Sequence, residues 1–575
     1  MGPRGRHSRS VASSNVASGN EIRLKKLQSG PTEMSGFRLS RLLLTLAVVC
    51  VCNSSVLAQI QLDRFFPPSV GVGQSTAIKA EGKFPKWPIR LTTDTVGVSV
   101  QAAEKSGMLQ VVVKNDATPG VVWIRGLDDN SASGLVPLLV EPIDPMVEVE
   151  PNDHLGTATE AELPCVVAGR LSKSGEVDTY RVFAKKGRKL VVSVMANRWL
   201  QSPMDAVLQV VDAEGHVLAQ ADDQRGLDPQ LVFMVEQDQA LFIRLFAFPE
   251  TPNSTIGFAG AETFVYQLQM TTDAFVDHVL PLSGELETPD NAVVHGWNLS
   301  RDAVAKNGNA KLFDGEVMHV PAALGWQYQG ANPAGGNDFF ESDDLVVIEK
   351  LPCSFSGQIS DMGEVDRVRL AVTKGSRCRV AVHSRRSGMI LDSVLRVVDL
   401  ENEKELGRND DMKRGEYDAR VDFVAERDGQ VEVQISDLVD GFGMRHAYTI
   451  VASIVEPSVE ATVAANHFAL KAGESLEVPI TVTRLDGYAM KVQFSVADLP
   501  GGVTCATIVS EAKGDSAKAV KLKLVAQDDL VYQGPIQIKA VGLADDNSVA
   551  GEPFHVTHEL AKMVRIDKFW LTVAP

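Results

Sequence analysis

Pro164-Cys165-Val-Val-Ala-Gly169-Arg-Leu-Ser-Lys-Ser-Gly175-Glu-Val-Asp178 is matched further along the chain by Pro352-Cys353-Ser-Phe-Ser-Gly357-Gln-Ile-Ser-Asp-Met-Gly363-Glu-Val-Asp366. The second stretch follows the first by 188 residues at every matched position. After a slip of one residue, Asp205-Ala-Val-Leu-Gln-Val-Val-Asp212 meets Asp392-Ser-Val-Leu-Arg-Val-Val-Asp399. A register of this length indicates an internal duplication, with one copy over 146–272 and the other over 339–455.

Both copies alternate apolar and polar residues in short runs, such as Leu190-Val-Val-Ser-Val-Met195 and Val421-Asp-Phe-Val424. Glycine and aspartate separate the runs at a spacing of about ten residues, which is typical of antiparallel sandwiches and barrels. Side chains on a strand alternate between its two faces, so each run buries one face and exposes the other. We therefore expect an all-β chain of tandem β-sandwich, jelly-roll-like modules.

The order of motifs in each copy resembles the bacterial pre-peptidase C-terminal (PPC) domain family. Glu150-Pro-Asn-Asp153, Gly-Glu-Val-Asp and Asp-x-x-Leu-x-Val-Val-Asp carry this resemblance, which covers about 240 of the 575 residues. The family implies a β-sandwich found beside secreted proteases, and it includes the collagen-binding domains of clostridial collagenases. The whole chain is similar in order to planctomycete-type secreted proteins that carry immunoglobulin-like modules.

The length exceeds what one hydrophobic core supports, so we expect several domains. We place an immunoglobulin-like β domain at 59–145, the first PPC-like sandwich at 146–272 and a small β domain with a linker at 273–338. The second PPC-like sandwich follows at 339–455, and an immunoglobulin- or fibronectin-like β domain at 456–575. In the first of these domains, Val98-Ser-Val-Gln-Ala102, Leu109-Gln-Val-Val-Val113 and Gly120-Val-Val-Trp-Ile-Arg125 are predicted strands.

The segment 1–58 reads as an N-terminal extension followed by a signal peptide. Arg38 and Arg41 precede the apolar run Leu42–Cys52, and Val56-Leu57-Ala58 offers a cleavage site before Gln59. The apolar run is too short to span a bilayer, so we expect no transmembrane segment in the mature chain. Translation could start at Met1 or Met34. The predicted location is outside the cell, in the periplasm or at the cell surface.

The charge of the chain limits its partners. The formal net charge is −18, so a nucleic-acid backbone is a poor partner, whereas divalent cations are attracted. We expect an extracellular protein or polysaccharide as the ligand. Four cysteines remain after residue 58; Cys353 and Cys378 share a module and could pair, or all four could be buried small apolar residues.

No catalytic arrangement stands out in the sequence. His555-Val-Thr-His558 lacks the glutamate of a zinc-peptidase helix, and no Gly-x-Ser-x-Gly elbow occurs. We therefore predict a non-catalytic, secreted multidomain protein for extracellular binding or architecture. The alternatives are an accessory protein of a secreted peptidase and an unrecognised hydrolase.

A candidate calcium site lies at the start of the first copy. Calcium prefers six to eight oxygen ligands, and oxygen-bearing side chains crowd together at Glu148, Glu150, Asn152 and Asp153, with Asp178 as the expected partner from the sandwich. In the collagen-binding members of the family, similar linker acids and a strand-end aspartate hold calcium. Here Glu176 stands where that family usually has an aspartate. The alternative is a solvated linker whose Asn and Asp make local turn bonds.

The second copy carries a weaker version of the site. Glu341-Ser-Asp343-Asp344 is taken to stand where Glu150-Pro-Asn-Asp153 stood in the first copy, with Asp366 in the place of Asp178.

Overall fold

The computed structural model describes most of the chain beyond the predicted signal peptide, and all of the described residues lie within the unit Leu57–Pro575. The described residues are 59–251, 257–280, 282, 293–299, 317–319, 323–328, 337–342, 344–561 and 564–575. The predicted N-terminal extension and signal peptide, 1–58, lie outside them.

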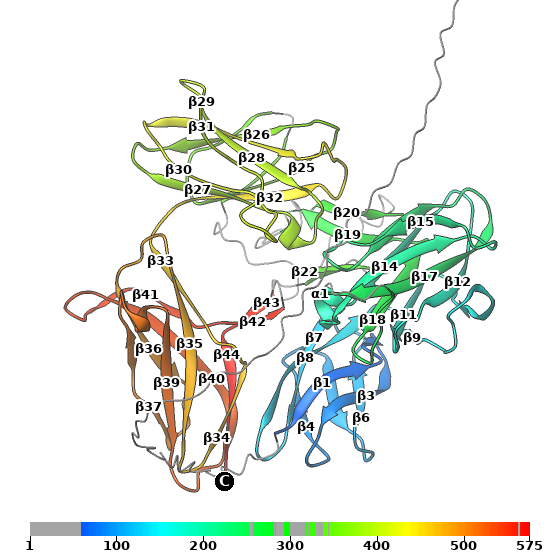
Figure 1. The fold of residues 1–575 in the computed structure, drawn as a ribbon, viewed down its shortest axis with the longest axis horizontal. Coiled ribbons are helices and arrows are strands. Elements are labelled where there is room, and N and C mark those ends of the chain that lie inside the picture. Colours follow the sequence, from blue (N-terminus) through cyan, green and yellow to red (C-terminus); the bar gives the residue numbers. More distant parts are fainter. Residues whose placement is uncertain are drawn as a thin grey trace, which may run out of the picture. The chain divides into compact units, whose positions relative to one another are not determined.

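Two four-stranded sheets form the region 59–145, in the orders β1-β3-β6-β5 and β2-β8-β7-β4 (Figure 1). Their strands are β1 Gln61–Phe66, β2 Ser69–Gly71, β3 Ser75–Lys83, β4 Arg90–Thr92, β5 Val98–Ala102, β6 Met108–Val113, β7 Gly120–Leu127 and β8 Ala132–Glu141. Apolar side chains of both sheets share one core, among them Ile78, Val111, Ile124 and Leu138. The three strands predicted from sequence in this region coincide with β5, β6 and β7.

The first repeat is a sandwich of two five-stranded sheets, β16-β13-β18-β11-β9 and β10-β12-β17-β14-β15. Its strands are β9 Met146–Val147, β10 Thr159–Glu160, β11 Cys165–Arg170, β12 Asp178–Ala184, β13 Lys189–Met195, β14 Met204–Val211, β15 Val217–Ala221, β16 Gln230–Met234, β17 Gln239–Pro249 and β18 Val265–Thr271. A single helical turn, α1 Asn197–Leu200, follows β13, and a 3-10 turn, Leu155–Thr157, precedes β10.

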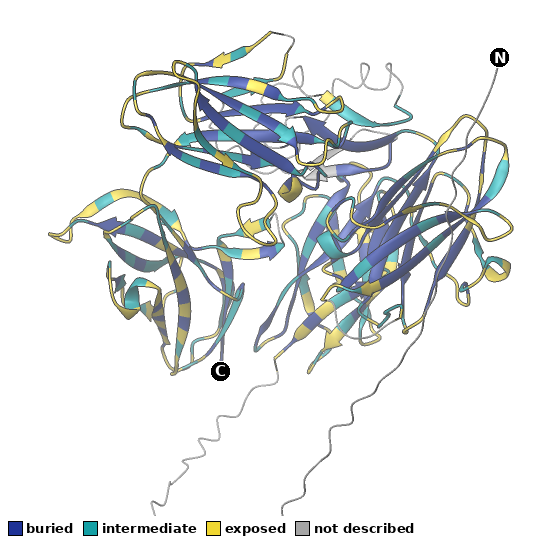
Figure 2. Cartoon of the chain, turned by 45° about the horizontal axis from the view of Figure 1, so that its top comes forward, coloured by how far each residue is buried: buried dark blue, intermediate teal, exposed yellow. Residues whose placement is uncertain are grey.

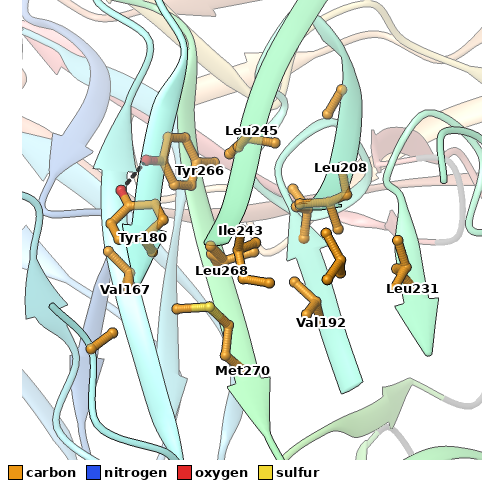
Figure 3. Close-up of a cluster of buried hydrophobic side chains, with 14 of the residues drawn as sticks. Val167, Tyr180, Val192, Leu208, Leu231, Ile243, Leu245, Tyr266, Leu268 and Met270 are labelled. Carbon is orange, nitrogen blue, oxygen red and sulfur yellow. Dashed lines mark hydrogen bonds between the residues drawn. The ribbon is translucent and has the colours of Figure 1, made fainter. Parts of the chain in front are cut away.

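Side chains from both sheets interdigitate in the core of this repeat (Figure 3). Val192 and Leu268 come from one sheet, and Leu208 and Ile243 come from the other. Figure 2 shows buried residues concentrated on the strands. Burial alternates along part of β12, but β11 and β18 are buried at every residue and β13 at all but its first. The prediction that each run exposes one face was therefore wrong for Leu190–Met195, because Val191 and Met195 pack into further apolar clusters on the other face of the sheet.

The second repeat has the same strand order, β30-β27-β32-β25-β23 and β24-β26-β31-β28-β29. Its strands are β23 Asp338–Phe340, β24 Val346–Ile348, β25 Cys353–Gln358, β26 Asp366–Val372, β27 Arg377–His383, β28 Ser393–Asp399, β29 Lys404–Asn409, β30 Arg420–Val424, β31 Gly429–Asp437 and β32 Ala447–Ile454. Every strand of the first repeat therefore has a counterpart at the same place in the second. A 3-10 turn, Arg385–Ser387, stands where the first repeat has α1.

Between the repeats and after them, the chain again forms strands. The described parts of 273–338 pair β19 Phe275–Leu280 with β20 Val293–Trp297, and β21 Val317–His319 with β22 Trp326–Tyr328. After residue 455 two sheets share a third core, in the orders β33-β35-β39-β37 and β34-β44-β40-β36-β38. The strands after residue 455 are β33 Ser458–Thr462, β34 His467–Lys471, β35 Ser475–Leu485, β36 Lys491–Ala497, β37 Val503–Cys505, β38 Ile508–Ser510, β39 Ala519–Ala526, β40 Tyr532–Leu543, β41 Val549–His555, β42 His558–Ala561, β43 Val564–Ile566 and β44 Lys568–Ala574.

The all-β fold class predicted from sequence is confirmed: the described chain consists of tandem β-sandwich modules. Helix is limited to single turns, including a last 3-10 turn at Asp515–Ala517. Within the described ranges, the helices are too short to cross a lipid bilayer.

The cysteine pairing considered for the second repeat does not form. Cys353 lies on β25 and Cys378 on β27, and β32 runs between these two strands. Two strand spacings of about 4.8 Å exceed the Cα separation of about 7 Å beyond which a disulfide cannot close. All four cysteines of the described chain are free thiols.

Shortening one core leucine should destabilise the first repeat. Leu268 is fully buried in its core, so Leu268→Ala is expected to lower the free energy of unfolding by about 2–5 kcal/mol. Hydrogen exchange at the amides of β13 and β18 measures this. The matched control is Leu218→Ala on β15, where the side chain is 40% exposed and the expected change is within about 0.5 kcal/mol. Equal effects of the two substitutions would contradict the assigned core.

Candidate metal centre

Glu148 reaches the sandwich because β9 runs parallel to the edge of β11. Its backbone N–H donates to the carbonyl of Ala168 at 3.1 Å, which continues the β9–β11 ladder by one residue. The side chain then passes over Gly169: a Cβ atom there would lie 2.6 Å from Oε2 of Glu148 and 2.3 Å from the hydroxyl of Tyr266. Only glycine leaves room for this contact.

Asp178, the first residue of β12, meets Glu148 at the hydroxyl of Tyr266. That hydroxyl is 2.5 Å from Oδ2 of Asp178 and 3.0 Å from Oε2 of Glu148. The hydroxyl of Tyr180 lies 2.5 Å from the Tyr266 oxygen, a contact drawn as a dashed line in Figure 3. The two tyrosines come from different sheets, so this contact also joins the sheets of the sandwich.

The two tyrosine hydroxyls supply fewer hydrogen-bond donors than the two carboxylates can accept. Tyr180 donates to Tyr266, and the single proton of Tyr266 can satisfy only one of the two carboxylates that it faces. Burial raises the pKa of Glu148 to about 7. Burial and then the charge of Glu148 raise the pKa of Asp178 well above its usual value. Asp178 is fully buried and Glu148 is half-buried, and two carboxylates this close require either a bound proton or a cation to compensate their charge.

Further oxygen atoms surround the pair. Glu150, Glu148 and Asp178 each offer a carboxylate oxygen, and the three atoms lie within 4.8 Å of one another. Asn152 is fully buried, its backbone carbonyl accepts a hydrogen bond from Thr179, and its backbone N–H donates to Glu150. Among the described residues, neither polar atom of the Asn152 side chain has a hydrogen-bond partner, and Oδ1 of Asp178 has none either.

These donors fit a hard divalent cation. Calcium binds oxygen atoms at about 2.3–2.6 Å, so two of its ligands lie at most about 5 Å apart. The spacing of the three carboxylates meets this limit, and they supply up to six oxygen atoms. The amide oxygen of Asn152 is a further buried oxygen ligand, and among the described residues it has no hydrogen-bond partner. No thiol or imidazole joins the three carboxylates, and such a donor set suits calcium better than zinc.

Asp153, a member of the predicted set, and Glu176, which stands where the family usually has an aspartate, make other contacts. Asp153 lies outside the group of three, and its carboxylate is 3.9 Å from Nζ of Lys173. Glu176 is buried and accepts hydrogen bonds from the backbone N–H of Lys173 and the hydroxyl of Ser172. It therefore holds the 172–176 loop in shape.

The second repeat requires a correction of the predicted alignment. The backbone N–H of Glu341 donates to the carbonyl of Ser356 at 2.9 Å, and Oε2 of Glu341 would lie 2.7 Å from a Cβ at Gly357. These are the contacts that Glu148 makes in the first repeat, so Glu341 is the counterpart of Glu148. The prediction that it stands in the place of Glu150 was wrong. The register of the backbone hydrogen bonds between strands decides which residues of the two repeats correspond, and the Glu-x-Asp-Asp motif does not.

The carboxylates that gather in the second repeat also differ from those predicted. Glu341, Glu364 and Asp366 offer oxygen atoms within 4.8 Å of one another, and the hydroxyl of Tyr448 donates to Asp366 at 2.6 Å. Burial is the largest cause that raises the pKa of Asp366 to about 7. Asp344 is exposed and outside this group, and Asp343 lies outside the described residues.

Sequence reasoning missed several residues of these sites. Glu364 could have been found as the counterpart of Glu176 in the repeated Gly-Glu-Val-Asp motif. Tyr266 and Tyr448 gave no signal, because a tyrosine in a strand usually fills a core. A third group, Asp212, Glu214 and His216, has ligand atoms within 4.8 Å of one another on the β14–β15 turn.

Comparisons with known proteins add little to this geometry. No family model matches the chain, and no curated protein matches it. Membership of the PPC family therefore stays a prediction.

The chain has a low-level similarity to several solved structures. The fibronectin(III)-like modules of Clostridium thermocellum CbhA are 12% identical over 40% of this chain and 92% of theirs, with a TM-score of 0.13. The M60 catalytic domain with two CBM51 domains from Clostridium perfringens ZmpB is 7% identical over 67% of this chain and 46% of that one, with a TM-score of 0.14. The native conformation of E. coli alpha-2-macroglobulin is 10% identical over 89% of this chain and 46% of that one, with a TM-score of 0.16. Likenesses at this level carry no argument about activity.

The raised pKa of Glu148 predicts a pH-dependent stability in the absence of metal. The folded form keeps a proton that the unfolded form releases, so the free energy of unfolding should fall as pH rises from 4.5 to about 7. One such proton corresponds to at most about 1.4 kcal/mol per pH unit. Glu148→Gln removes this titrating group. The melting temperature of the variant, relative to that of the wild type, should therefore increase as pH rises across the same range. Melting curves in EDTA measure the difference.

The control for this experiment is Glu236→Gln, which neutralises an exposed carboxylate of the same repeat. Its melting temperature should run parallel to that of the wild type at every pH. Parallel curves for Glu148→Gln as well would contradict the assigned burial of Glu148.

Proposed function

We propose that this chain is a secreted, non-catalytic multidomain protein that binds or organises extracellular material, and that calcium stiffens the segment leading into its first repeat. One observation carries the calcium part: Glu148, Glu150 and Asp178 converge where Asn152 and Asp178 keep buried polar atoms without partners. The binding role is supported by the tandem β-sandwich modules.

Calcium accounts for these carboxylates better than a proton does. A single proton neutralises one charge, whereas three carboxylates converge, and the pKa of Glu150 is also raised, first of all by burial. A divalent ion balances more of this charge and also takes up lone pairs that no donor satisfies. Glu148 to Asn152 follow directly after β9, so an ion held there would tie the entering segment to β12.

The proposed location and partner follow from charge and from the predicted signal peptide. A net charge of −18 disfavours nucleic acid and anionic membranes. It is compatible with a neutral or cationic ligand, either a protein or a polysaccharide. Such a ligand would be met outside the cell, where calcium is also abundant.

The structure offers little support for catalysis. Among the described residues, two carboxylate–imidazole pairs approach to 2.7 Å: Nδ1 of His278 with Oδ2 of Asp277, and Nδ1 of His555 with Oδ2 of Asp567. Both side chains of the first pair are fully buried, so a substrate cannot reach them. The second pair is partly exposed, and no catalytic role is assigned to it. The third group, on the β14–β15 turn, is half-buried to exposed.

Calcium should raise the melting temperature of the chain. For a dissociation constant of about 0.1–1 mM, typical of extracellular calcium modules, about 5 mM calcium adds roughly 1–2 kcal/mol to the free energy of unfolding. Glu150→Gln combined with Asp178→Asn should abolish the shift, because these substitutions remove two charges and keep the side-chain shapes. Differential scanning calorimetry with and without calcium measures it.

Two variants serve as controls. Asp153→Asn should keep the calcium shift, since Asp153 lies outside the group of three. Asp366→Asn should also keep the calcium shift, since the proposed ion binds in the first repeat. A wild-type melting curve that calcium leaves unchanged would refute the site.

The non-catalytic assignment predicts no turnover in a casein and glycan screen of the purified chain. Clear, EDTA-sensitive hydrolysis would overturn it and favour a hydrolase. Co-purification with a protease from culture medium would instead favour an accessory role beside a peptidase.

A further inference from the structure

The β14–β15 and β28–β29 turns are counterparts with closely similar backbone bonds. Oδ1 of Asp212 accepts the backbone N–H of Glu214 at 3.0 Å, and Oδ1 of Asp399 accepts that of Glu401 at 3.0 Å. Both turns follow a register shift in the ladder at the preceding residues. The aspartate of each turn therefore holds the backbone N–H two residues on in both repeats, although the second turn is one residue longer.

In the second repeat an arginine occupies the space between these acids. Nε of Arg427 is 3.0 Å from Oδ2 of Asp399, and Nη1 is 2.5 Å from Oε2 of Glu401. The guanidinium thus bridges the two carboxylates. Lys404, the first residue of β29, pairs instead with Glu426 at 2.5 Å.

The position of Arg427 has a clear counterpart in the first repeat. Asp428 accepts the backbone N–H of Lys374 at 2.8 Å, and Asp238 accepts that of Lys186 at 2.7 Å. These matched bonds fix the register of the loop before β31 and of the loop before β17. The residue before each aspartate is Arg427 in one repeat and Gln237 in the other.

The first repeat therefore keeps the two acids and lacks the guanidinium. The amide of Gln237 donates to Gln239 at 3.3 Å. His216 ends the turn, and its Nδ1 lies 3.0 Å from Oδ2 of Asp212. Within the described part of the chain, no lysine or arginine forms an ion pair with either acid.

We propose that Asp212, Glu214 and His216 bind a divalent transition metal such as Zn²⁺, which takes the place that the Arg427 guanidinium fills in the second repeat. Two observations carry this independently. The ligand atoms lie within 4.8 Å of one another, and the matched acids of the second repeat hold a cation. This site is distinct from the calcium site proposed above.

The ligand set favours zinc over calcium. Imidazole nitrogen is a preferred ligand of zinc, copper and nickel and a poor one of calcium. Two carboxylates and one imidazole leave a fourth position open to water or to a ligand of the chain's partner. His216 is 76% exposed on its side chain, so its ring can turn to an ion without disturbing the core. Gly215, with φ of +88°, allows the turn to bring His216 back towards Asp212.

The test is a calorimetric titration of the purified chain with ZnCl₂, in excess calcium to fill all-oxygen sites. His216→Ala should remove one zinc equivalent or weaken it at least about tenfold. Gln237→Arg should do the same without altering any ligand, because it supplies the guanidinium of the second repeat. Unchanged melting temperatures in the absence of zinc show that both variants are folded.

The reciprocal exchange completes the design. Arg427→Gln together with Lys404→His should add one zinc equivalent to the wild-type number. A wild-type chain without a His216-dependent equivalent would overturn the proposal. Zinc binding by Gln237→Arg as tight as that of the wild type, or no gain in the reciprocal variant, would also count against it.

Discussion

The half-buried carboxylate of Glu148 and the fully buried carboxylate of Asp178 meet at one tyrosine hydroxyl, and their charge constrains the structure around them. Tyr266 can donate only one proton, and Tyr180 uses its own on Tyr266. Placing negative charge in a site of low polarity costs free energy unless a proton or a cation accompanies it. The contact also joins both sheets and the segment after β9. An ion bound there acts on the packing of the whole repeat.

Comparison of the two repeats shows which parts of this arrangement they have in common. Both repeats keep a glycine beneath the entering glutamate, at Gly169 and Gly357, and a tyrosine that donates to the strand-end aspartate. The second tyrosine is not kept: Val368 occupies the position of Tyr180 in the ladder. The hydroxyl network of the first repeat is accordingly shorter in the second, where Glu364 joins the carboxylates.

At the β14–β15 end both repeats also keep the two turn acids, while Arg427 of the second repeat is replaced by Gln237 in the first. An arginine is an internal cation that needs no supply from the medium, whereas a metal ion depends on its concentration outside the cell. The second repeat satisfies its turn acids with Arg427, and the first keeps an open position beside His216. The same turn therefore has an arginine beside its acids in the second repeat and none in the first. The difference rests on side chains at the surface, where substitutions leave the core intact.

The sequence by itself determined the all-β class, the duplication, three strands of the first domain and the acids Glu148, Glu150 and Asp178. These depend on local features of the sequence: alternating apolar and polar residues, turn-forming residues and repeated motifs. Only the tertiary structure decided that Tyr266 lies across Asp178, that Glu341 corresponds to Glu148, and that Gln237 and Arg427 occupy matching places. These relations depend on the register between strands far apart in the chain. Backbone hydrogen bonds between strands set that register, and the amino-acid sequence of a single strand does not specify it.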